Sequence, residues 1–205
     1  MKGKIYLIGG GEIAKGETKT IDESIKKATP KGSLFVFFAT AADDSEDYAK
    51  TIISVFEDHF NVIVASREKG RYFMEDAIKN ASVIYLGGGM TQLLLDLFEK
   101  WELVHLLREA NEHGTLIVGM SAGAQALCEY YIHEEDNSFE LRKGWGIVSL
   151  GCLVHANENS FLKSQELCLK SMPKKLKFIG IGEKVSWCID NSKEYVVGEG
   201  SIWEN

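Results

Sequence analysis

Short, almost uninterrupted apolar runs alternate with segments of helical period through the first 130 residues of the chain. The runs are KIYLI (4–8), SLFVFFA (33–39), NVIVA (61–65), SVIYLG (82–87) and TLIVG (115–119). Continuous apolar character is typical of strands that are covered on both faces, as in a parallel sheet. Because parallel neighbours need crossover helices, the pattern predicts an α/β fold: a doubly wound, mostly parallel sheet flanked by helices.

The helical segments between these runs have recognisable starts and stops. Thr20 and Glu23 have the spacing of a capping box, and Pro30 with Gly32 would end that helix. Ser45 precedes a segment with acidic residues in its first turn, which suits a helix N-terminus. The segments TQLLLDLFEK and WELVHLLREANEHG predict two further helices, the second of them stopped at Gly114.

The C-terminal part of the chain has a different pattern. Four short runs lie close together: KFIGIG (177–182), SWCID (186–190), YVVGE (195–199) and SIW (201–203). Such spacing favours antiparallel hairpin strands added to one edge of the sheet. We expect residues 1–205 to form a single α/β domain.

Composition and charge exclude several classes of partner. The chain has 45% hydrophobic and 26% charged residues and a net charge of −7, which argues against a nucleic-acid or membrane surface as partner. No apolar run has the length of a membrane span or a signal-peptide core, so we expect a cytoplasmic protein. The four cysteines, Cys128, Cys152, Cys168 and Cys188, lack the close spacing of a metal or redox motif, and we expect reduced, mostly buried thiols.

A serine between glycines follows the fifth apolar run. The segment from Gly119 to Gly123 (GMSAG) fits G-x-S-x-G, the nucleophile elbow, with a buried strand before it and the helical segment AGAQALCEYY after it. Such a turn needs small neighbours, aims the hydroxyl over the end of the sheet and places it at a helix N-terminus. Ser121 is therefore a candidate nucleophile; the alternative is that it only caps the helix.

A nucleophilic serine needs a base and an acid. The best candidate for the base is His155, because it lies at the end of an apparent strand, where active sites of open α/β sheets form. The other histidines lie in helical segments (His59, His105 and His113) or in a polar stretch (His133). The carboxylates that could orient the ring are a cluster 13–15 residues after the serine and one that follows the histidine: Glu134, Glu135, Asp136 and Glu158.

A glycine-rich turn after the fourth apolar run could bind the oxyanion. Gly87, Gly88 and Gly89 precede a helical segment, and a backbone without side chains there can turn its N–H groups toward a reacting carbonyl. A phosphate-binding loop or a plain tight turn would use the same glycines.

With GMSAGA, YLGGGM and the histidine after LGCLV in place, the chain resembles the serine peptidases of the dipeptidase E and cyanophycinase family, which have the class I glutamine amidotransferase-like fold. The resemblance implies that Ser121 is the nucleophile and His155 the base. It places the acid about fifteen residues past the serine, on Asp136 with Glu135 adjacent.

The same resemblance implies an oxyanion hole made by backbone N–H groups of Gly88 or Gly89 and of Ala122. It also implies hydrolysis of small peptides next to an aspartyl residue, without metal or cofactor. We expect a monomer or homodimer.

The chain departs from the family at positions that could bind substrate. Met90 stands where the family usually has asparagine, and the segment after His155 contains no arginine. A buried aspartyl side chain is best held by a guanidinium. Arg142 is one candidate, Arg67 and Arg71 are others, and Glu183 in IGIGEKVSW matches a family position near the site.

Three other interpretations remain open. Gly9, Gly10, Gly11 and Ala14 match G-x-G-x-x-A after a strand, as in dinucleotide-binding proteins, although the following segment is polar and the helix starts late. An α/β-hydrolase esterase shares the elbow, but would have more chain after it. A non-catalytic homologue that binds a small peptide or metabolite is the third.

Overall fold

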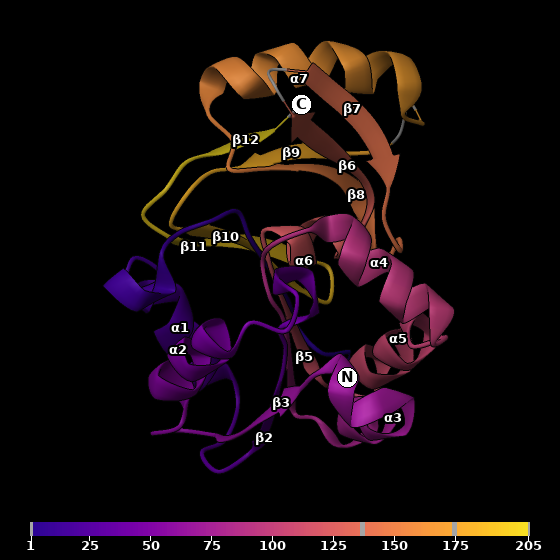
Figure 1. Cartoon of the computed structure of the whole chain (residues 1–205). Coiled ribbons are helices and arrows are strands. Elements are labelled where there is room, and N and C mark those ends of the chain that lie inside the picture. The colour runs from indigo at the N-terminus through magenta and orange to yellow at the C-terminus, as the bar shows by residue number, and fades with distance from the viewer. Residues whose placement is uncertain (1, 136–137, 174–175, 205) are drawn as a thin grey trace.

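The computed structural model describes residues 2–135, 138–173 and 176–204, which form two sheets stacked one above the other with helices around them (Figure 1). The strands of the larger sheet run in the order β11-β10-β1-β5-β4-β2-β3. Their bounds are β1 Ile5–Ile8, β2 Leu34–Phe38, β3 Asn61–Ala65, β4 Val83–Leu86, β5 Leu116–Met120, β10 Val185–Asp190 and β11 Lys193–Gly198. The five strands β1 to β5 pair in parallel, and β10 and β11 add an antiparallel hairpin beside β1.

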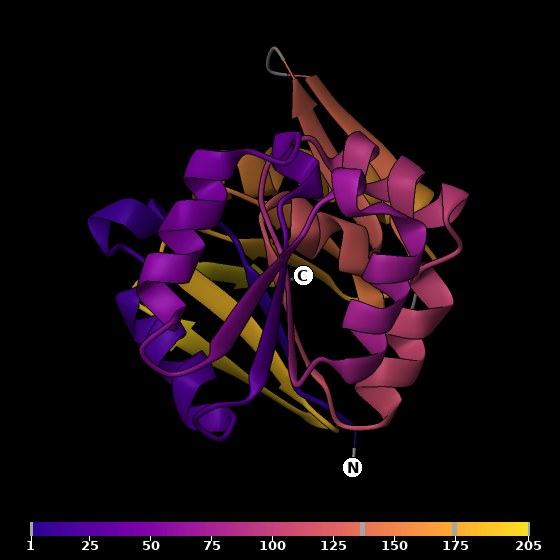
Figure 2. The same ribbon diagram turned by 60° about the horizontal axis from the view of Figure 1, so that its bottom comes forward.

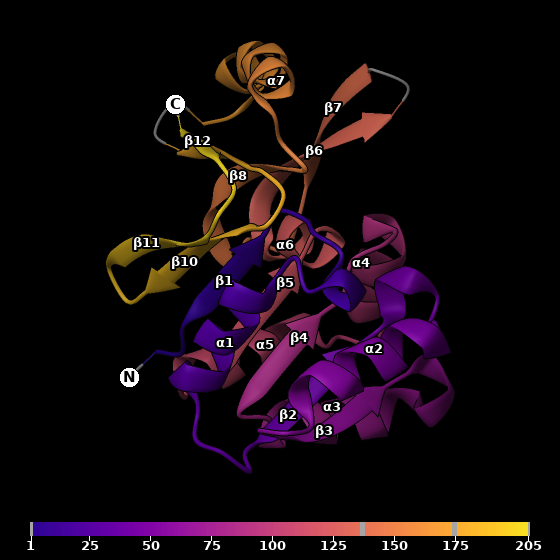
Figure 3. The ribbon, with the colours of Figure 1, turned by 90° about the vertical axis from the view of Figure 1, so that its left-hand side faces the viewer.

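Helices cover both faces of this sheet, as the alternation of apolar runs and helical segments predicts. The helices are α1 Lys19–Ala28, α2 Glu46–Phe56, α3 Gly70–Asn80, α4 Thr91–Lys100, α5 Val104–Glu112 and α6 Ala122–Leu127. Helices α1 and α2 pack on one face, while α3 to α6 pack on the other (Figure 3). Helix α2 is capped by Ser45 as expected, because the Ser45 hydroxyl accepts the N–H of Tyr48 at 3.3 Å.

The capping box expected at Thr20 and Glu23 does not form. Helix α1 begins at Lys19, preceded by Thr18, whose side chain makes no cap hydrogen bond. The Thr18 hydroxyl donates instead to the buried carboxylate of Asp22 at 2.8 Å. The helix thus begins one residue before Thr20, and a side-chain pair inside its first turn replaces the expected box.

The smaller sheet was not foreseen from the sequence. Its strands are β6 Cys128–Glu135, β7 Ser138–Lys143, β8 Val148–Val154, β9 Phe178–Ile181 and β12 Ile202–Glu204, in the order β12-β9-β8-β6-β7. Helix α7, Glu158–Ser171, covers its outer face, and the hairpin of β6 and β7 extends beyond the rest of the molecule (Figure 2). The expected helix after Ser121 ends at Leu127, and the C-terminal strands divide between the two sheets.

The buried apolar residues form one cluster on each face of the larger sheet and a third under α7, and each cluster contains at least one cysteine. Cys128, Cys152, Cys168 and Cys188 are all buried free thiols, as expected. No helix in the described part of the chain has the length and apolar character that crossing a membrane requires.

Candidate active site

Ser121 occupies the sharp turn between β5 and α6. Its backbone has φ 49° and ψ −106°, a conformation that non-glycine residues rarely adopt and that needs support from its surroundings. The Ser121 N–H donates to the carbonyl of Ile8 at 2.9 Å, and the Ser121 carbonyl accepts the N–H of Gln125 at 3.0 Å. Strand β1 and helix α6 therefore hold the turn from both sides.

The glycines on either side of the turn are required by close packing. A Cβ at Gly119 would lie 2.6 Å from the backbone nitrogen of Ala124, and one at Gly123 would lie 2.2 Å from the carbonyl oxygen of Leu86. Both contacts are with backbone atoms, which cannot move aside cheaply. The G-x-S-x-G pattern thus reflects the packing of α6 against β5 and β4 at this point.

His155 meets the serine from the second sheet. It follows β8 directly, and its Nε2 lies 2.7 Å from Ser121 Oγ. His155 has a left-handed backbone, φ 51°, and its N–H donates to the carbonyl of Gly9 at 3.1 Å. This bond ties the end of the smaller sheet to the loop after β1, so the ring is placed over the larger sheet.

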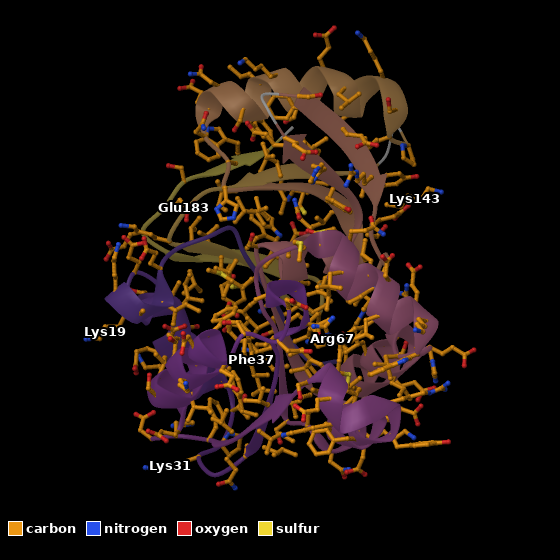
Figure 4. The ribbon with its side chains drawn as sticks, viewed as in Figure 1. Lys19, Lys31, Phe37, Arg67, Lys143 and Glu183 are labelled. Atoms are coloured by element: carbon orange, nitrogen blue, oxygen red, sulfur yellow. The ribbon has the colours of Figure 1, made fainter. Side chains whose placement is uncertain are left out.

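The carboxylate on the other side of the ring belongs to Glu183. The Glu183 Oε1 lies 2.5 Å from His155 Nδ1, and both side chains are about half exposed. Glu183 lies in the turn between β9 and β10, at the level where the two sheets meet (Figure 4). A carboxylate that accepts from Nδ1–H leaves the lone pair of Nε2 free to accept the serine proton.

Glu135, one of the acids expected from the spacing after the serine, lies beside a different histidine. The carboxylate of Glu135 is 3.5 Å from Nε2 of His133, on the hairpin of β6 and β7, and Asp136 lies outside the described residues. The structure thus brings Glu183, expected as a substrate-binding residue, to the ring of His155. Glu183 is 28 residues from His155, and no spacing rule connects the two.

The glycines after β1 make room for the histidine and the glutamate. A Cβ at Gly10 would lie 2.2 Å from Glu183 Oε2 and 2.5 Å from His155 Nδ1. The Lys184 N–H donates to the Gly10 carbonyl at 3.0 Å and fixes the turn that carries Glu183. These glycines suggested a dinucleotide-binding loop, but the His155–Glu183 pair occupies the space above Gly10. The glycines alone do not reveal this pair, because it forms only when the end of β8 and the β9–β10 turn meet above Gly10.

The triple-glycine turn lies beside the serine. A Cβ at Gly88 would be 3.4 Å from Ser121 Cβ, and the Gly88 N–H donates to the hydroxyl of Tyr48 at 3.3 Å. Within the described part of the chain, the N–H of Gly89 has no recorded hydrogen-bond acceptor, and Ala122, as the first residue of α6, has no intrahelical one. Gly89 and Ala122 therefore offer N–H donors near the Ser121 hydroxyl, while Gly88 is engaged by Tyr48.

A cavity of about 560 Å³ opens in front of the serine and the histidine, and we call it the Arg142 cavity. Its walls include Met90, Gln125, His133 and Arg142. Gln125 is held on two sides, because its Oε1 accepts from the Thr91 hydroxyl and its Nε2 donates to the Ile132 carbonyl. Met90 is 59% exposed and presents an apolar side chain at the rim.

Arg142 is the arginine that reaches this cavity. Its Nε and Nη2 donate to one carboxylate oxygen of Glu140 at 2.8 and 2.6 Å. Arg67 binds Asp43 and Asp44 instead, and Arg71 binds the carboxylates of Glu75 and Glu102. Of the three arginines considered from the sequence, Arg142 therefore has the position to contact a substrate.

Comparison with known proteins identifies the family of this chain. The model of peptidase family S51 matches residues 5–196. The chain belongs to peptidase family S51. Membership in S51 agrees with the resemblance that the elbow, the glycine turn and the later histidine indicate.

Relatives of the S51 family and one solved structure extend the comparison. The uncharacterized peptidase YgaJ of Bacillus subtilis is 33% identical over 60% of this chain and 55% of its own length. Peptidase E of Haemophilus influenzae is 34% identical over 46% of this chain and 42% of its own length. The chain thus spans about half the length of the curated relatives it matches. The crystal structure of a peptidase from an acI-B1 Actinobacterium shares the fold, with a TM-score of 0.71, 23% identity and coverage of 98% of this chain and 90% of that one.

Proposed function

We propose that this chain is a serine peptidase that hydrolyses small peptides through an acyl-enzyme. The observation that carries the proposal is the continuous contact from Ser121 Oγ to His155 Nε2, at 2.7 Å, and from His155 Nδ1 to Glu183, at 2.5 Å. This is the spatial order of nucleophile, base and orienting acid that serine hydrolases on unrelated folds share.

The reaction follows from the roles of these groups. Ser121 Oγ attacks the scissile carbonyl carbon while its proton passes to His155 Nε2, and the N–H groups of Gly89 and Ala122 bind the developing oxyanion. The imidazolium, stabilised by the Glu183 carboxylate, then gives its proton to the leaving amine, and the C–N bond breaks. Water, deprotonated by the same ring, attacks the acyl-enzyme and releases the acid and the free serine.

The Arg142 cavity supports recognition of an acidic substrate side chain. Arg142 donates from two of its nitrogens to Glu140 and also hydrogen-bonds the Tyr131 side chain, and the rest of its five N–H groups are available for a substrate carboxylate. We therefore propose an aspartyl dipeptidase-like specificity. The neutral Met90 lies at the rim of the same cavity.

The test uses the parent chain and the Ser121→Ala variant. A panel of dipeptides that vary in the N-terminal residue measures kcat/KM, and a fluorophosphonate probe measures covalent labelling of the serine. We expect hydrolysis with an aspartyl preference, labelling of the parent chain only, and a loss of about 10⁴–10⁶-fold in turnover for Ser121→Ala with the fold unchanged. Turnover of the variant within tenfold of the parent would remove Ser121 from the mechanism, and inertness toward every peptide and the probe would favour a non-catalytic binding protein.

A further inference from the structure

A second cavity, of about 260 Å³, lies on the opposite face of the larger sheet from the Arg142 cavity. We call it the Tyr48 cavity. Its lining residues are Gly11, Glu12, Ile13, Ala14, Tyr48, Thr51 and Met120. Met120, Ile13 and Tyr48 belong to the core under α1 and α2, whereas Ala122 of the elbow helix belongs to the core on the other face. The nucleophile therefore stands between two cavities.

Three residues that line the Tyr48 cavity are neighbours of the proposed active site, either in the sequence or through a hydrogen bond. Met120 immediately precedes Ser121, Gly11 follows the Gly10 that faces His155 and Glu183, and the Tyr48 hydroxyl accepts the N–H of Gly88. The cavity is thus joined to the site by covalent or hydrogen-bonded neighbours from three different segments.

The geometry of acyl transfer directs substrate toward both cavities. Strand β5, which carries Ser121, lies between β1, above which the His155–Glu183 pair sits, and β4, which carries the glycine turn. The histidine and the oxyanion donors thus flank the serine along the plane of the sheet. In a tetrahedral intermediate, one substituent of the carbonyl carbon is Oγ and another is the oxyanion at the glycine turn. The remaining two, the acyl chain and the leaving nitrogen, must diverge toward the two faces of the sheet.

The two cavities differ in chemistry. The Arg142 cavity is lined by an arginine, a glutamate, two histidines and several polar side chains, whereas the Tyr48 cavity is lined by three apolar side chains, one phenol ring, one threonine and one glutamate. The phenol stays neutral, because burial raises the pKa of Tyr48 to about 12. The charged residue among the lining residues, Glu12, is paired with Lys15 Nζ at 2.9 Å. No unpaired charge in these walls would attract a charged side chain.

The walls of the Tyr48 cavity are fixed before any ligand enters. The Tyr48 ring packs edge-on against Phe37 with centroids 5.0 Å apart, and a Cβ at Gly87 would lie 2.9 Å from its Cε1. The short turn that carries Ile13 is closed by the Gly16 N–H, which donates to the Ile13 carbonyl at 2.9 Å. Preformed walls reduce the ordering entropy lost on binding.

From these observations we propose that the Tyr48 cavity is a substrate subsite for an uncharged, apolar side chain of leucine or phenylalanine size. The substrate residue on one side of the scissile bond occupies the Arg142 cavity. The residue on the other side of the bond places its apolar side chain in the Tyr48 cavity. The assignment rests on the proposed peptidase function, and it predicts a substrate that is polar on one side of the bond and apolar on the other.

The test measures binding and turnover separately. Dipeptides Asp-Gly, Asp-Leu and Asp-Phe, and the reversed Gly-Asp, Leu-Asp and Phe-Asp, are titrated calorimetrically into Ser121→Ala, and their kcat/KM is measured with the parent chain. We expect the leucine and phenylalanine peptides of one series to bind at least about tenfold more tightly than the glycine peptide, because their side chains leave water for an apolar cavity.

Variants of Ala14 connect this preference to the cavity. Ala14 is exposed, so Ala14→Trp narrows the cavity and Ala14→Asp adds a charge without disturbing the core. Either change should abolish the difference in affinity between the glycine peptide and the leucine and phenylalanine peptides. Ala28→Trp, at an equally exposed alanine at the end of α1, is the matched control and should preserve the preference.

The outcomes separate the two proposals. Binding with the expected preference but no turnover contradicts the peptidase and leaves the subsite standing. Turnover without any discrimination between glycine and leucine in either series, or with discrimination that Ala14→Trp and Ala14→Asp leave intact, overturns the subsite alone. Absence of binding of every peptide contradicts both.

Discussion

Replacement of Gly10 by alanine tests whether the contact between His155 and Glu183 matters for catalysis. The new Cβ would lie 2.2 Å from Glu183 Oε2 and 2.5 Å from His155 Nδ1, where ordinary van der Waals contact begins at 3.4 Å. Gly10 does not have a positive φ, so the backbone itself accepts alanine without strain. The added methyl group must therefore displace the carboxylate, the imidazole or both.

The size of the effect follows from these distances. Either group has to move by about 1 Å, and misplacement on that scale costs on the order of 10²-fold in catalysis. If the hydrogen bond between the two groups is lost altogether, the ring also loses the partner that selects its tautomer, which costs up to about 10⁴-fold in the serine proteases. We therefore expect kcat/KM to fall by about 10²–10⁴-fold.

Stability should change much less than activity. The closest contact is with the end of a flexible, half-exposed glutamate side chain, which can swing toward solvent. The assay pairs steady-state kinetics on a cleaved dipeptide with thermal unfolding of the same samples. Gly32→Ala is the control, because that glycine has φ +81° and open space around it, so the change should reduce stability by about 1 kcal/mol and leave turnover unaltered. A Gly10→Ala enzyme with turnover within tenfold of the parent would refute the assigned role of the pair.

Three further predictions concern single groups. Glu183→Gln removes the charge beside His155 and should lower kcat for dipeptide hydrolysis by about 10²–10⁴-fold. The matched Glu135→Gln should leave kcat nearly unchanged, and equal losses in the two variants would contradict the assignment of Glu183 as the orienting acid. Tyr48→Phe removes the hydroxyl that holds the Gly88 N–H, and we expect kcat to fall by about tenfold with KM and the thermal midpoint retained; an unaltered kcat would show that the glycine turn needs no such support. Burial raises the pKa of Asp22 to about 6, above its value of about 4 in the unfolded chain. The folded state thus binds more protons between these values, and the free energy of unfolding should fall as pH rises through this window, then level off. Asp22→Asn should remove this slope and raise stability near pH 7 by up to roughly 3 kcal/mol in urea unfolding; an unchanged slope would contradict burial as its source.

The strands of the larger sheet could be predicted because both of their faces are buried. Residues of β1, β2, β4 and β5 are apolar almost without exception, so the pattern is visible without knowledge of the partners. The elbow could be predicted for a similar reason, since the tight packing around Ser121 excludes side chains at Gly119 and Gly123.

The second sheet could not be predicted in the same way. Strand β6 reads CEYYIHEE, and its polar residues lie on a hairpin that extends away from the core, so no continuous apolar run marks it. The role of Glu183 was hidden for another reason. It depends on the β9–β10 turn crossing from one sheet to the other, a long-range arrangement that leaves no local periodicity.

That crossing also sets an order on the folding of the chain. Strand β10 inserts beside β1, so this edge of β1 stays unpaired until a strand far along the chain has been made. Until Glu183 leaves the ribosome, a nascent chain carries a serine and an imidazole without the carboxylate proposed to align them. In the proposed mechanism, a copy that ends before Glu183 would lack this carboxylate, and full turnover would require folding that has joined both sheets.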